Sequence, residues 1–468
     1  MTLLDHWLTL HVLTVMAGLA IYVTSSRTLH LRRHPTVAIG WVIALIFLPY
    51  ISLPLYLIFG IRKVNIYLPA DRPHEETLHT SHPNTLAGQT QQLAAVMRLP
   101  AACAYQQLNL HQDGTQALQV LRNMIDSATR SIDLSTFILA HDGLGDEIVQ
   151  HLERRAREGI KVRLLVDGVG VYLGGRHDFK RLSSEGIQVA LFVPPLRSSL
   201  RGRTNLRNHR KMLITDNEWL WCGGRNLASE YFEGDPLHAP GSLSWIDLSF
   251  DLKGSLAWQA QQLFEQDWQF ATHKALPGQY TLPDRDLPTG LVTGQLFASG
   301  PDQVDDTIYT ILISNFFNAR KSILAVTPYF VPDPTLLMSL TLAARRGVTV
   351  DLLVPKKSNH RLADIARHRA LRELAAAGAR VWILPRMIHA KAIVIDHELA
   401  LAGTANLDER SLFLNYELML AFYESSDVRR FAQWIENQRS AAVAYDKQPP
   451  GFWRETLEGL LLWLAFQL

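Results

Sequence analysis

The stretch His209-Arg210-Lys211-Met212-Leu213-Ile214-Thr215-Asp216 returns later in the chain as His389-Ala390-Lys391-Ala392-Ile393-Val394-Ile395-Asp396. Each copy leads into a glycine with an asparagine three residues further on, Gly223 with Asn226 and Gly403 with Asn406. His389 lies 180 residues after His209, and Asn406 lies 180 residues after Asn226. A motif that recurs at one constant spacing indicates that the chain contains two homologous halves.

The duplication extends upstream of the two motifs. Three further pairs of segments match: 128–138 with 319–329, 157–166 with 345–354, and 182–189 with 374–381. The last two pairs read as a helix that ends at a glycine and is followed by a strand rich in β-branched residues. Because helices and strands alternate, we predict an α/β fold with two homologous α/β sandwich halves in tandem.

Two runs near the N-terminus, 7–26 and 36–61, contain no Asp, Glu, Lys or Arg. Each is long enough for a helix across the bilayer, which takes about 20 residues. No basic segment precedes the first run, so a cleaved signal peptide is not expected. Pro49 and Pro54 predict a kink or local break in the second helix. We therefore predict a two-helix transmembrane hairpin, and basic residues after both runs leave its orientation open.

The apolar runs, the proline-rich stretches and the repeat together predict six parts. They are a transmembrane hairpin (1–63), a linker (64–105), a first half (106–270), a second linker (271–294), a second half (295–447) and a C-terminal apolar or amphipathic helix (448–468). For the last part, membrane-surface binding and docking on the core are both open.

The composition restricts the partners. Lys and Arg number 46 against 44 Asp and Glu, a net charge of +2, so no global charge indicates nucleic acid. The two cysteines, Cys103 and Cys222, form neither a disulfide framework nor a zinc-ligand pattern. No group of His, Asp and Glu shows metal-ligand spacing, so we expect neither a metal nor another cofactor.

The repeated motif favours phosphoryl transfer. Alternate strand residues share a face, so His209 and Lys211 project together, as do His389 and Lys391. If the two halves bring these strands together, one histidine can attack phosphorus while the other protonates the leaving oxygen. The lysines, with the amides of Asn226 and Asn406, would bind the phosphate oxygens.

Two acids occupy matching strands after the motifs, Asp247 and Glu417. We expect each to accept the Nδ1–H of the histidine in its own half, which would fix the ring tautomer. Asp216 and Asp396 lie five residues beyond the lysines and face away in a regular strand. They are candidates for holding the loops that carry the two asparagines.

His-x-Lys-x4-Asp with a following Gly-x-x-Asn resembles the signature of the phospholipase D superfamily, and both copies fit it. Over nearly its whole length the chain is similar to bacterial cardiolipin synthases, including the segments 264–268 and 403–411. The resemblance implies two phospholipase D-like halves after a membrane hairpin, in a multi-pass protein of the bacterial inner membrane. It implies the catalytic set His209, Lys211, Asp216, His389, Lys391 and Asp396.

The implied reaction transfers a phosphatidyl group from one phosphatidylglycerol to another through a phosphohistidine, giving cardiolipin and glycerol. The expected partners are phosphatidylglycerol and other anionic phospholipids, without nucleic acid, and self-association is left open. One departure is that Gly224 and Arg225 stand where the family more typically has a hydroxyl residue after the first glycine. Gly224 would lose a phosphate hydrogen bond that Arg225 could restore.

Other functions use the same motifs. They are a membrane phospholipase D, a synthase with phosphatidylethanolamine as donor, a nuclease, and a membrane scaffold with a decayed site. The predicted hairpin and neutral charge disfavour a nuclease, and the intact motifs disfavour a decayed site. Superfamily analogy favours His209 as nucleophile and His389 as general acid, although the likeness of the halves leaves this open.

Overall fold

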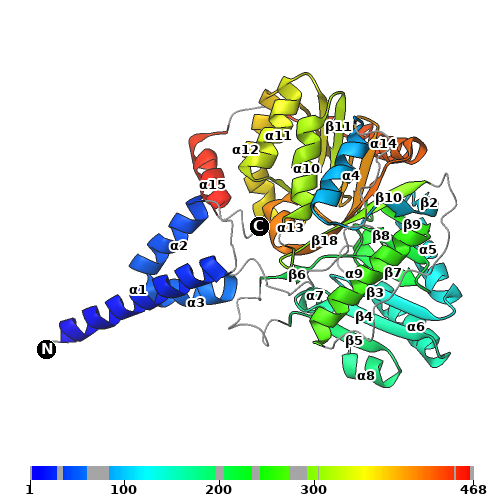
Figure 1. Ribbon diagram of the computed structural model, residues 1–468, viewed down its shortest axis with the longest axis horizontal. Helices are drawn as coiled ribbons and strands as arrows, with labels where there is room; N and C mark the ends of the chain where they lie inside the picture. The colour runs from blue at the N-terminus through cyan, green and yellow to red at the C-terminus, as the bar shows by residue number, and fades with distance from the viewer. Residues whose placement is uncertain are drawn as a thin grey trace.

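The computed structural model describes residues 3–28, 35–60, 84–194, 205–234, 243–273, 292–303, 305–446 and 450–463. Two β-sheets dominate it, and Figure 1 shows them as two adjoining bodies. Their helices are α4 (Leu86–Val96), α5 (Gly114–Ser127), α6 (Leu144–Arg157), α7 (Gly170–Leu173), α8 (Phe179–Ser184), the 3-10 turn η2 (Ser229–Tyr231), α9 (Ser255–Thr272), α10 (Thr307–Asn318), α11 (Pro334–Arg345), α12 (Arg361–Ala376), α13 (Glu409–Phe413) and α14 (Ser425–Arg439).

The first sheet has the strand order β2-β9-β8-β7-β3-β4-β5. Its strands are β2 (Gln106–Leu110), β3 (Ser131–Thr136), β4 (Lys161–Asp167), β5 (Gln188–Phe192), β7 (Met212–Thr215), β8 (Trp219–Gly223) and β9 (Ser249–Lys253). β3, β4 and β5 are parallel, whereas β7 is antiparallel to both of its neighbours, β3 and β8.

The second sheet repeats this order as β10-β18-β16-β15-β11-β13-β14, with β1 added at one edge and β19 at the other. Its strands are β1 (Cys103–Ala104), β10 (Thr293–Ser299), β11 (Ser322–Val326), β13 (Thr349–Pro355), β14 (Arg380–Leu384), β15 (Ala392–Ile395), β16 (Leu399–Gly403), β18 (Asn415–Phe422) and β19 (Val443–Ala444). A short pair, β12 (Phe330–Val331) with β17 (Leu407–Asp408), lies apart. The shared order confirms two homologous α/β halves in tandem.

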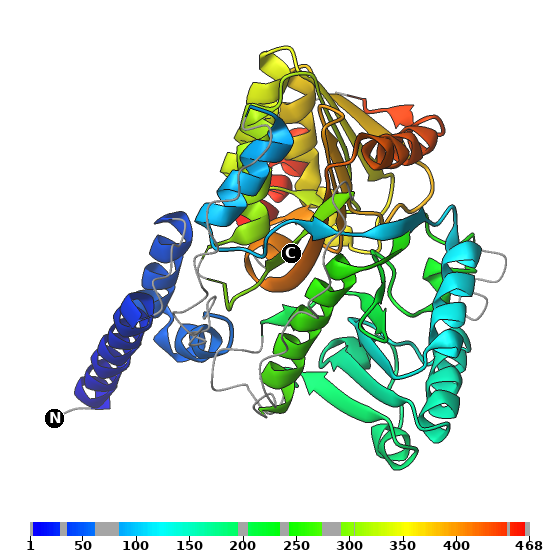
Figure 2. The ribbon, with the colours of Figure 1, turned by 45° about the vertical axis from the view of Figure 1, so that its right-hand side comes forward.

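The two halves share one apolar core. Buried side chains of β9 and α9 from the first half belong to the same cluster as those of β18 and α14 from the second. Phe422 packs edge-on against Phe250, with ring centroids 5.6 Å apart, and lies 4.8 Å from the ring of Phe431. Burying a side chain of this size contributes about 1.5–3 kcal/mol. Each sheet covers its other face with its own helices, α5 and α6 in the first half and α10, α11 and α12 in the second (Figure 2).

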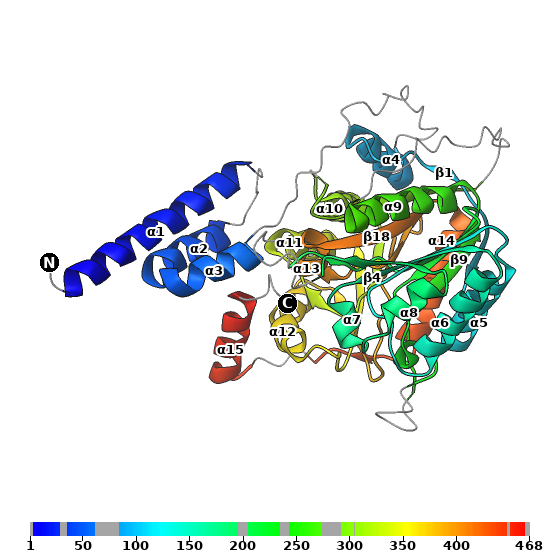
Figure 3. The ribbon, with the colours of Figure 1, turned by 90° about the horizontal axis from the view of Figure 1, so that it is seen from below.

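The predicted membrane hairpin is not confirmed. α1 (Leu3–Thr28) contains the one helix of the described chain that is long and apolar enough to cross a membrane, from His6 to Ser25. The second apolar run is divided at Leu48 into α2 (Pro35–Phe47) and α3 (Pro49–Phe59). The break follows from Pro49, which begins α3 and lacks the N–H that a continuous helix would need. The three helices stand away from the two sheets (Figure 3).

Part of the expected linker 64–105 belongs to the second half. α4 begins at a Thr85 cap and packs on α10, where Thr90 Oγ1 donates to Asn315 Oδ1 at 2.8 Å. β1 then pairs with β10. The chain therefore contributes to the second sheet before the first half begins. The linker 271–294 lies mostly outside the described residues.

The C-terminal helix docks on the core. α15 (Phe452–Trp463) packs against α12, and its buried Glu458 forms ion pairs with Arg372 and Arg454. The side chains of Leu457 and of residues 460–468 lie outside the described residues.

The motif aspartates, Asp216 and Asp396, lie in the turns of the hairpins β7–β8 and β15–β16. Their backbone is left-handed, with φ of 56° and 53°. The Asp216 carboxylate accepts the backbone N–H groups of residues 129, 130 and 131, at 2.8, 2.6 and 2.9 Å. Asp396 accepts those of residues 320, 321 and 322, at 2.7, 2.7 and 2.8 Å. Each aspartate thus anchors the start of the neighbouring parallel strand, β3 or β11, and not the loop with the asparagine.

These contacts predict a stability defect. Asp216→Asn removes a charged acceptor from three amides, so the free energy of unfolding should fall by about 1–3 kcal/mol, measured by urea titration at neutral pH. Turnover per folded molecule should change little. The matched control is Glu218→Gln, at an exposed position of the same turn, which should stay within about 0.5 kcal/mol of wild type. Normal stability with lost activity would assign Asp216 to the chemistry.

Candidate active site

Backbone hydrogen bonds between the halves place the two motif histidines. The N–H of His209 donates to the Tyr416 carbonyl of β18 at 2.9 Å, just after β6 (Arg207–Asn208) pairs with the same strand. In the matching position the N–H of His389 donates to the Ile246 carbonyl at 2.7 Å, next to a bridge between Ile246 and Ile388. The segment that carries each histidine therefore lies beside the segment of the other half that carries the acid.

The acid of one half binds the histidine of the other. His209 Nδ1 lies 2.9 and 3.1 Å from the two carboxylate oxygens of Glu417, and His389 Nδ1 lies 2.8 Å from Asp247 Oδ2. The expectation that each acid serves its own half is wrong. The cause is the backbone register, since Tyr416 and Ile246 directly precede the two acids. A carboxylate at Nδ1 holds that nitrogen in its N–H form and leaves Nε2 to react.

The two lysines lie beside the histidines and are buried. Lys211 Nζ donates to the His209 carbonyl at 2.8 Å, and Lys391 Nζ lies 2.8 Å from Nδ1 and 2.9 Å from Nε2 of His389. Burial lowers the pKa of Lys211 to about 7 and that of Lys391 to about 8, against the opposing effect of the two acids. A protonated lysine at these positions is therefore costly until an anion enters.

Burial also lowers the pKa of both imidazoles, to about 4 for His209 and about 3 for His389. The facing carboxylate opposes this shift, whereas the lysines of both halves reinforce it. Burial alone would raise the pKa of Asp247 and Glu417, but the histidine and lysine contacts lower it. Since each lysine acts on the histidine of the other half, the two motifs form one electrostatic site with neutral imidazoles and ionised acids.

The two carboxylates are held differently. Glu417 accepts the Thr404 hydroxyl at 2.6 Å and the Asn415 amide at 3.2 Å. At the position matching Thr404 stands Gly224, where a Cβ would come within 2.3 Å of Asp247 Oδ1. At this position Thr404 therefore hydrogen-bonds Glu417, and Gly224 leaves room for Asp247. Arg225, expected near the phosphate, is buried and donates to the Tyr231 carbonyl and Ser249 Oγ instead.

The asparagines of the motif brace the surrounding loops. Asn226 Nδ2 donates to the Tyr231 hydroxyl at 2.8 Å, and its Oδ1 accepts the Ile138 N–H at 3.3 Å. Asn406 Nδ2 donates to Ser411 Oγ at 3.1 Å. Each amide thus donates a hydrogen within the protein, and Asn406 also interacts with the Asp408 carboxylate.

Sequence reasoning missed several neighbours of the histidines. Phe137 packs edge-on against His209 at 5.2 Å, and Tyr231 does the same to His389 at 5.1 Å. The residue between His209 and Lys211 also contributes, because buried Arg210 pairs with Asp267 of α9 and donates to the Glu417 carbonyl. The Phe-Glu-Gln-Asp-Trp segment at 264–268 was the available signal for this ion pair.

Asp216 and Asp396 are not among the residues that the fold gathers at the histidines. Their carboxylates bind backbone amides at the opposite ends of β7 and β15, as described above. The structure brings together His209, Lys211, His389, Lys391, Asp247 and Glu417.

Comparisons with known proteins identify the family of this chain. A family model described as "Cardiolipin synthase, PLD-like domain" matches residues 121–268 and 312–439, and one described as "Phospholipase_D-nuclease N-terminal" matches residues 15–60. Cardiolipin synthase A of Pseudomonas putida (strain W619) is 31% identical over 85% of this chain and 84% of its own length. Cardiolipin synthase A of Pseudomonas aeruginosa (strain LESB58) is 31% identical over 82% of this chain and 80% of its own.

Among solved structures, the phosphatidylserine synthase of Haemophilus influenzae Rd KW20 shares the fold. It has a TM-score of 0.64 at 15% identity and covers 82% of this chain and 100% of that one. The matched family model spans both halves, and the sequence relatives extend over most of both chains. This chain therefore belongs to the cardiolipin synthase family, a family of phosphatidyltransferases with phospholipase D-like domains.

Proposed function

We propose that this protein is a cardiolipin synthase that transfers a phosphatidyl group from one phosphatidylglycerol to another through a phosphohistidine. The observation that carries the proposal is the pair of buried imidazoles, each held at Nδ1 by a carboxylate of the other half. Two such histidines beside two lysines supply a nucleophile, a proton donor and counter-charges for a phosphodiester.

His209 is assigned as the nucleophile. Its side chain is 13% exposed against 3% for His389. Within the described structure, the hydrogen bonds of its imidazole ring all involve Nδ1. Its Nε2 attacks phosphorus, the P–O bond to the glycerol headgroup breaks, and a phosphatidyl–His209 forms. The oxygen of the departing glycerol takes a proton from His389.

The proton for this step is held between His389 and Lys391. Neutral His389 has no proton on Nε2, but the Lys391 ammonium lies 2.9 Å away, and its pKa is lowered to about 8. A bound phosphodiester adds one negative charge, which favours the protonated imidazole. In the second step His389 takes the proton from the free hydroxyl of another phosphatidylglycerol. That oxygen attacks phosphorus, the P–N bond to His209 breaks, and cardiolipin leaves.

The phosphate oxygens are bound by Lys211 and Lys391, with the amides of Asn226 and Asn406 beside them. Burial makes these contacts stronger than they would be in water. Asp247 and Glu417 orient the rings and stabilise the charged imidazole that forms in each step.

The N-terminal helices give access to lipid. We assign α1 as a membrane-spanning helix, with α2 and α3 packed beside it in the apolar layer. Ser25 and Tyr56 join α1 to α3 through their hydroxyls at 2.5 Å. These helices support the proposal that the protein lies in a bacterial inner membrane, where both phosphatidylglycerol substrates are concentrated in one plane.

Two histidine variants test the assignment. His209→Ala and His389→Ala should each abolish cardiolipin formation on phosphatidylglycerol vesicles, because attack and proton transfer are both required. With a p-nitrophenyl phosphodiester, whose leaving group needs no proton, His389→Ala should still release a burst of p-nitrophenol and His209→Ala should not. The reverse pattern would exchange the roles. Retention of more than about a tenth of wild-type turnover by either variant would contradict the single-site mechanism.

The crossed acids give a second test. Glu417→Gln removes the carboxylate that raises the pKa of His209, so that pKa should fall further, and turnover should drop by roughly two to four orders of magnitude. In ¹⁵N-histidine NMR spectra the change should appear at the His209 ring and leave His389 almost unaltered. Asp247→Asn is the matched variant and should alter His389. A response in the histidine of the same half would refute the crossed pairing.

The products separate a synthase from a hydrolase. With labelled phosphatidylglycerol, cardiolipin and glycerol should form in near-equal amounts with little phosphatidic acid, because a buried site disfavours water as acceptor. Excess glycerol should consume cardiolipin, since donor and product are both phosphodiesters. Phosphatidic acid as main product without reversal would indicate a membrane phospholipase D. Faster synthesis with ethanolamine release would indicate phosphatidylethanolamine as donor.

A further inference from the structure

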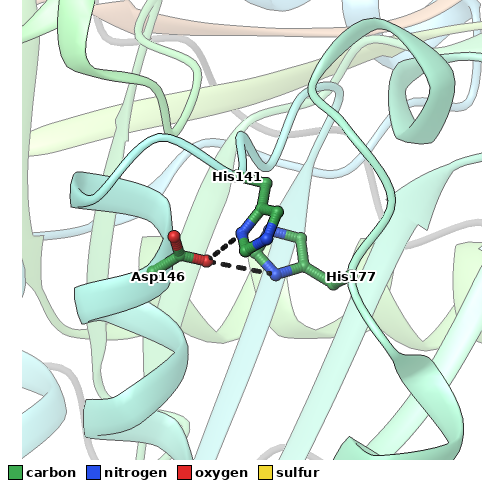
Figure 4. A group of neighbouring side chains, drawn as sticks. All are labelled: His141, Asp146 and His177. Atoms are coloured by element: carbon green, nitrogen blue, oxygen red, sulfur yellow. Dashed lines mark hydrogen bonds and ion pairs between the residues drawn. The ribbon is translucent and has the colours of Figure 1, made fainter. Parts of the chain in front are cut away.

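A second cluster of chemically active side chains lies in the first half, outside the phosphoryl-transfer site. Figure 4 shows His141, Asp146 and His177, whose nearest ligand atoms all lie within 4.8 Å of one another. His141 follows β3, Asp146 lies in the first turn of α6, and His177 lies between α7 and α8. The spacing of these residues along the chain gives no sign of the group, because the fold brings His177 to the other two from a later segment.

His177 is held in one orientation. Its side chain is 6% exposed, and its Nε2 lies 3.0 Å from the Ala140 carbonyl. A carbonyl only accepts, so Nε2 donates a hydrogen to it and Nδ1 is the ring nitrogen directed at the cluster. Nδ1 faces Asp146 Oδ1 at 3.6 Å, beyond hydrogen-bond distance. This gap between an imidazole nitrogen and a carboxylate oxygen is wide enough for a cation that binds both.

His141 and Asp146 supply the other two candidate ligands. His141 Nδ1 hydrogen-bonds the same Asp146 oxygen at 2.5 Å, and the rings of His141 and His177 lie 5.2 Å apart. The second oxygen of Asp146 accepts the Gly143 N–H at 3.3 Å, which fixes the carboxylate. A backbone hydrogen bond from a ligand histidine and another to a ligand carboxylate are the supporting contacts of metal sites.

We propose that His141, Asp146 and His177 bind a divalent transition ion of the Zn²⁺ class. In a tetrahedral zinc site, with bonds of about 2.0–2.1 Å, ligand atoms lie about 3.4 Å apart. The gap between His177 and Asp146 already has this width. The ion replaces the proton shared by His141 and Asp146, and this proton passes to solvent. The His141 ring, which is 62% exposed, moves outward to make room for the ion. The remaining coordination position faces water.

The ligand set selects the ion. Two imidazoles with one carboxylate favour zinc, cobalt or nickel over magnesium and calcium, which prefer an all-oxygen set. The bound ion would link the loop after β3 to the segment before α8. It is separate from the catalytic residues, although Phe137, which contacts His209, lies on the same β3–α6 connection.

Cobalt titration of the untagged, metal-stripped full chain in detergent tests the proposal without any lipid substrate. Wild type should bind one Co²⁺ with visible d–d absorption, which Zn²⁺ displaces and Mg²⁺ does not. His177→Gln and His141→Ala should weaken binding at least tenfold. His141→Ala changes an exposed side chain, so its folding is expected to be normal. Zn²⁺ should raise the melting temperature of wild type but not of either variant.

The matched control is His151→Gln on α6. His151 also pairs with an aspartate, at 2.8 Å from Asp126, but has no second imidazole beside it in the part of the chain that the structure describes. It should bind Co²⁺ like wild type, as should His209→Ala, which excludes the catalytic histidine as the ligand. No saturable Co²⁺ binding, or binding unchanged in both His141→Ala and His177→Gln, would overturn the site. Neither outcome bears on cardiolipin synthesis, because no step of the proposed reaction uses this ion.

Discussion

The exchange of strand contacts between the halves is the constraint on which the active site depends. β6 pairs with β18, and the segment before His389 bridges the segment before Asp247. These backbone contacts decide which carboxylate each imidazole meets. The shared core of β9, β18, α9 and α14 holds the two sheets in the register that the contacts require. Packing far from the histidines therefore determines which carboxylate meets each imidazole, and through it the ring tautomer.

Charge balance links the site to its substrate. Two ionised acids face two lysines, and both imidazoles are neutral because burial lowers their pKa. The group of six is then close to neutral in the ligand-free protein. A phosphodiester brings a negative charge into a space that already disfavours unpaired charge, and protonation of a buried lysine or histidine compensates it. In the proposed reaction, binding of substrate would prepare the general acid in this way.

The sequence predicts the α/β class, the duplication and the residues that meet at the site, since these follow from repeat spacing and strand alternation. It does not reveal which acid serves which histidine, because Asp247 and Glu417 occupy equivalent places and only the contact between halves distinguishes them. It assigns Asp216 and Asp396 to the catalytic set by motif, whereas the hairpin geometry gives them backbone amides to bind. It predicts the break at Pro49 between α2 and α3, because proline lacks the N–H that a continuous helix needs. It overlooks α4, whose partner α10 lies far downstream.

The parallel pairing of β6 with β18 has a consequence for biosynthesis. Residues 207–208 leave the ribosome long before residues 415–416, to which they bind. Until then the nascent chain carries His209 without its carboxylate, whereas His389 is made after Asp247 and before Glu417. On the proposed mechanism the chain therefore becomes competent only when β18, its last catalytic strand, is in place. A fragment ending anywhere before β18 would lack Glu417, and by the proposed mechanism it would not cleave phospholipid at the lipid surface.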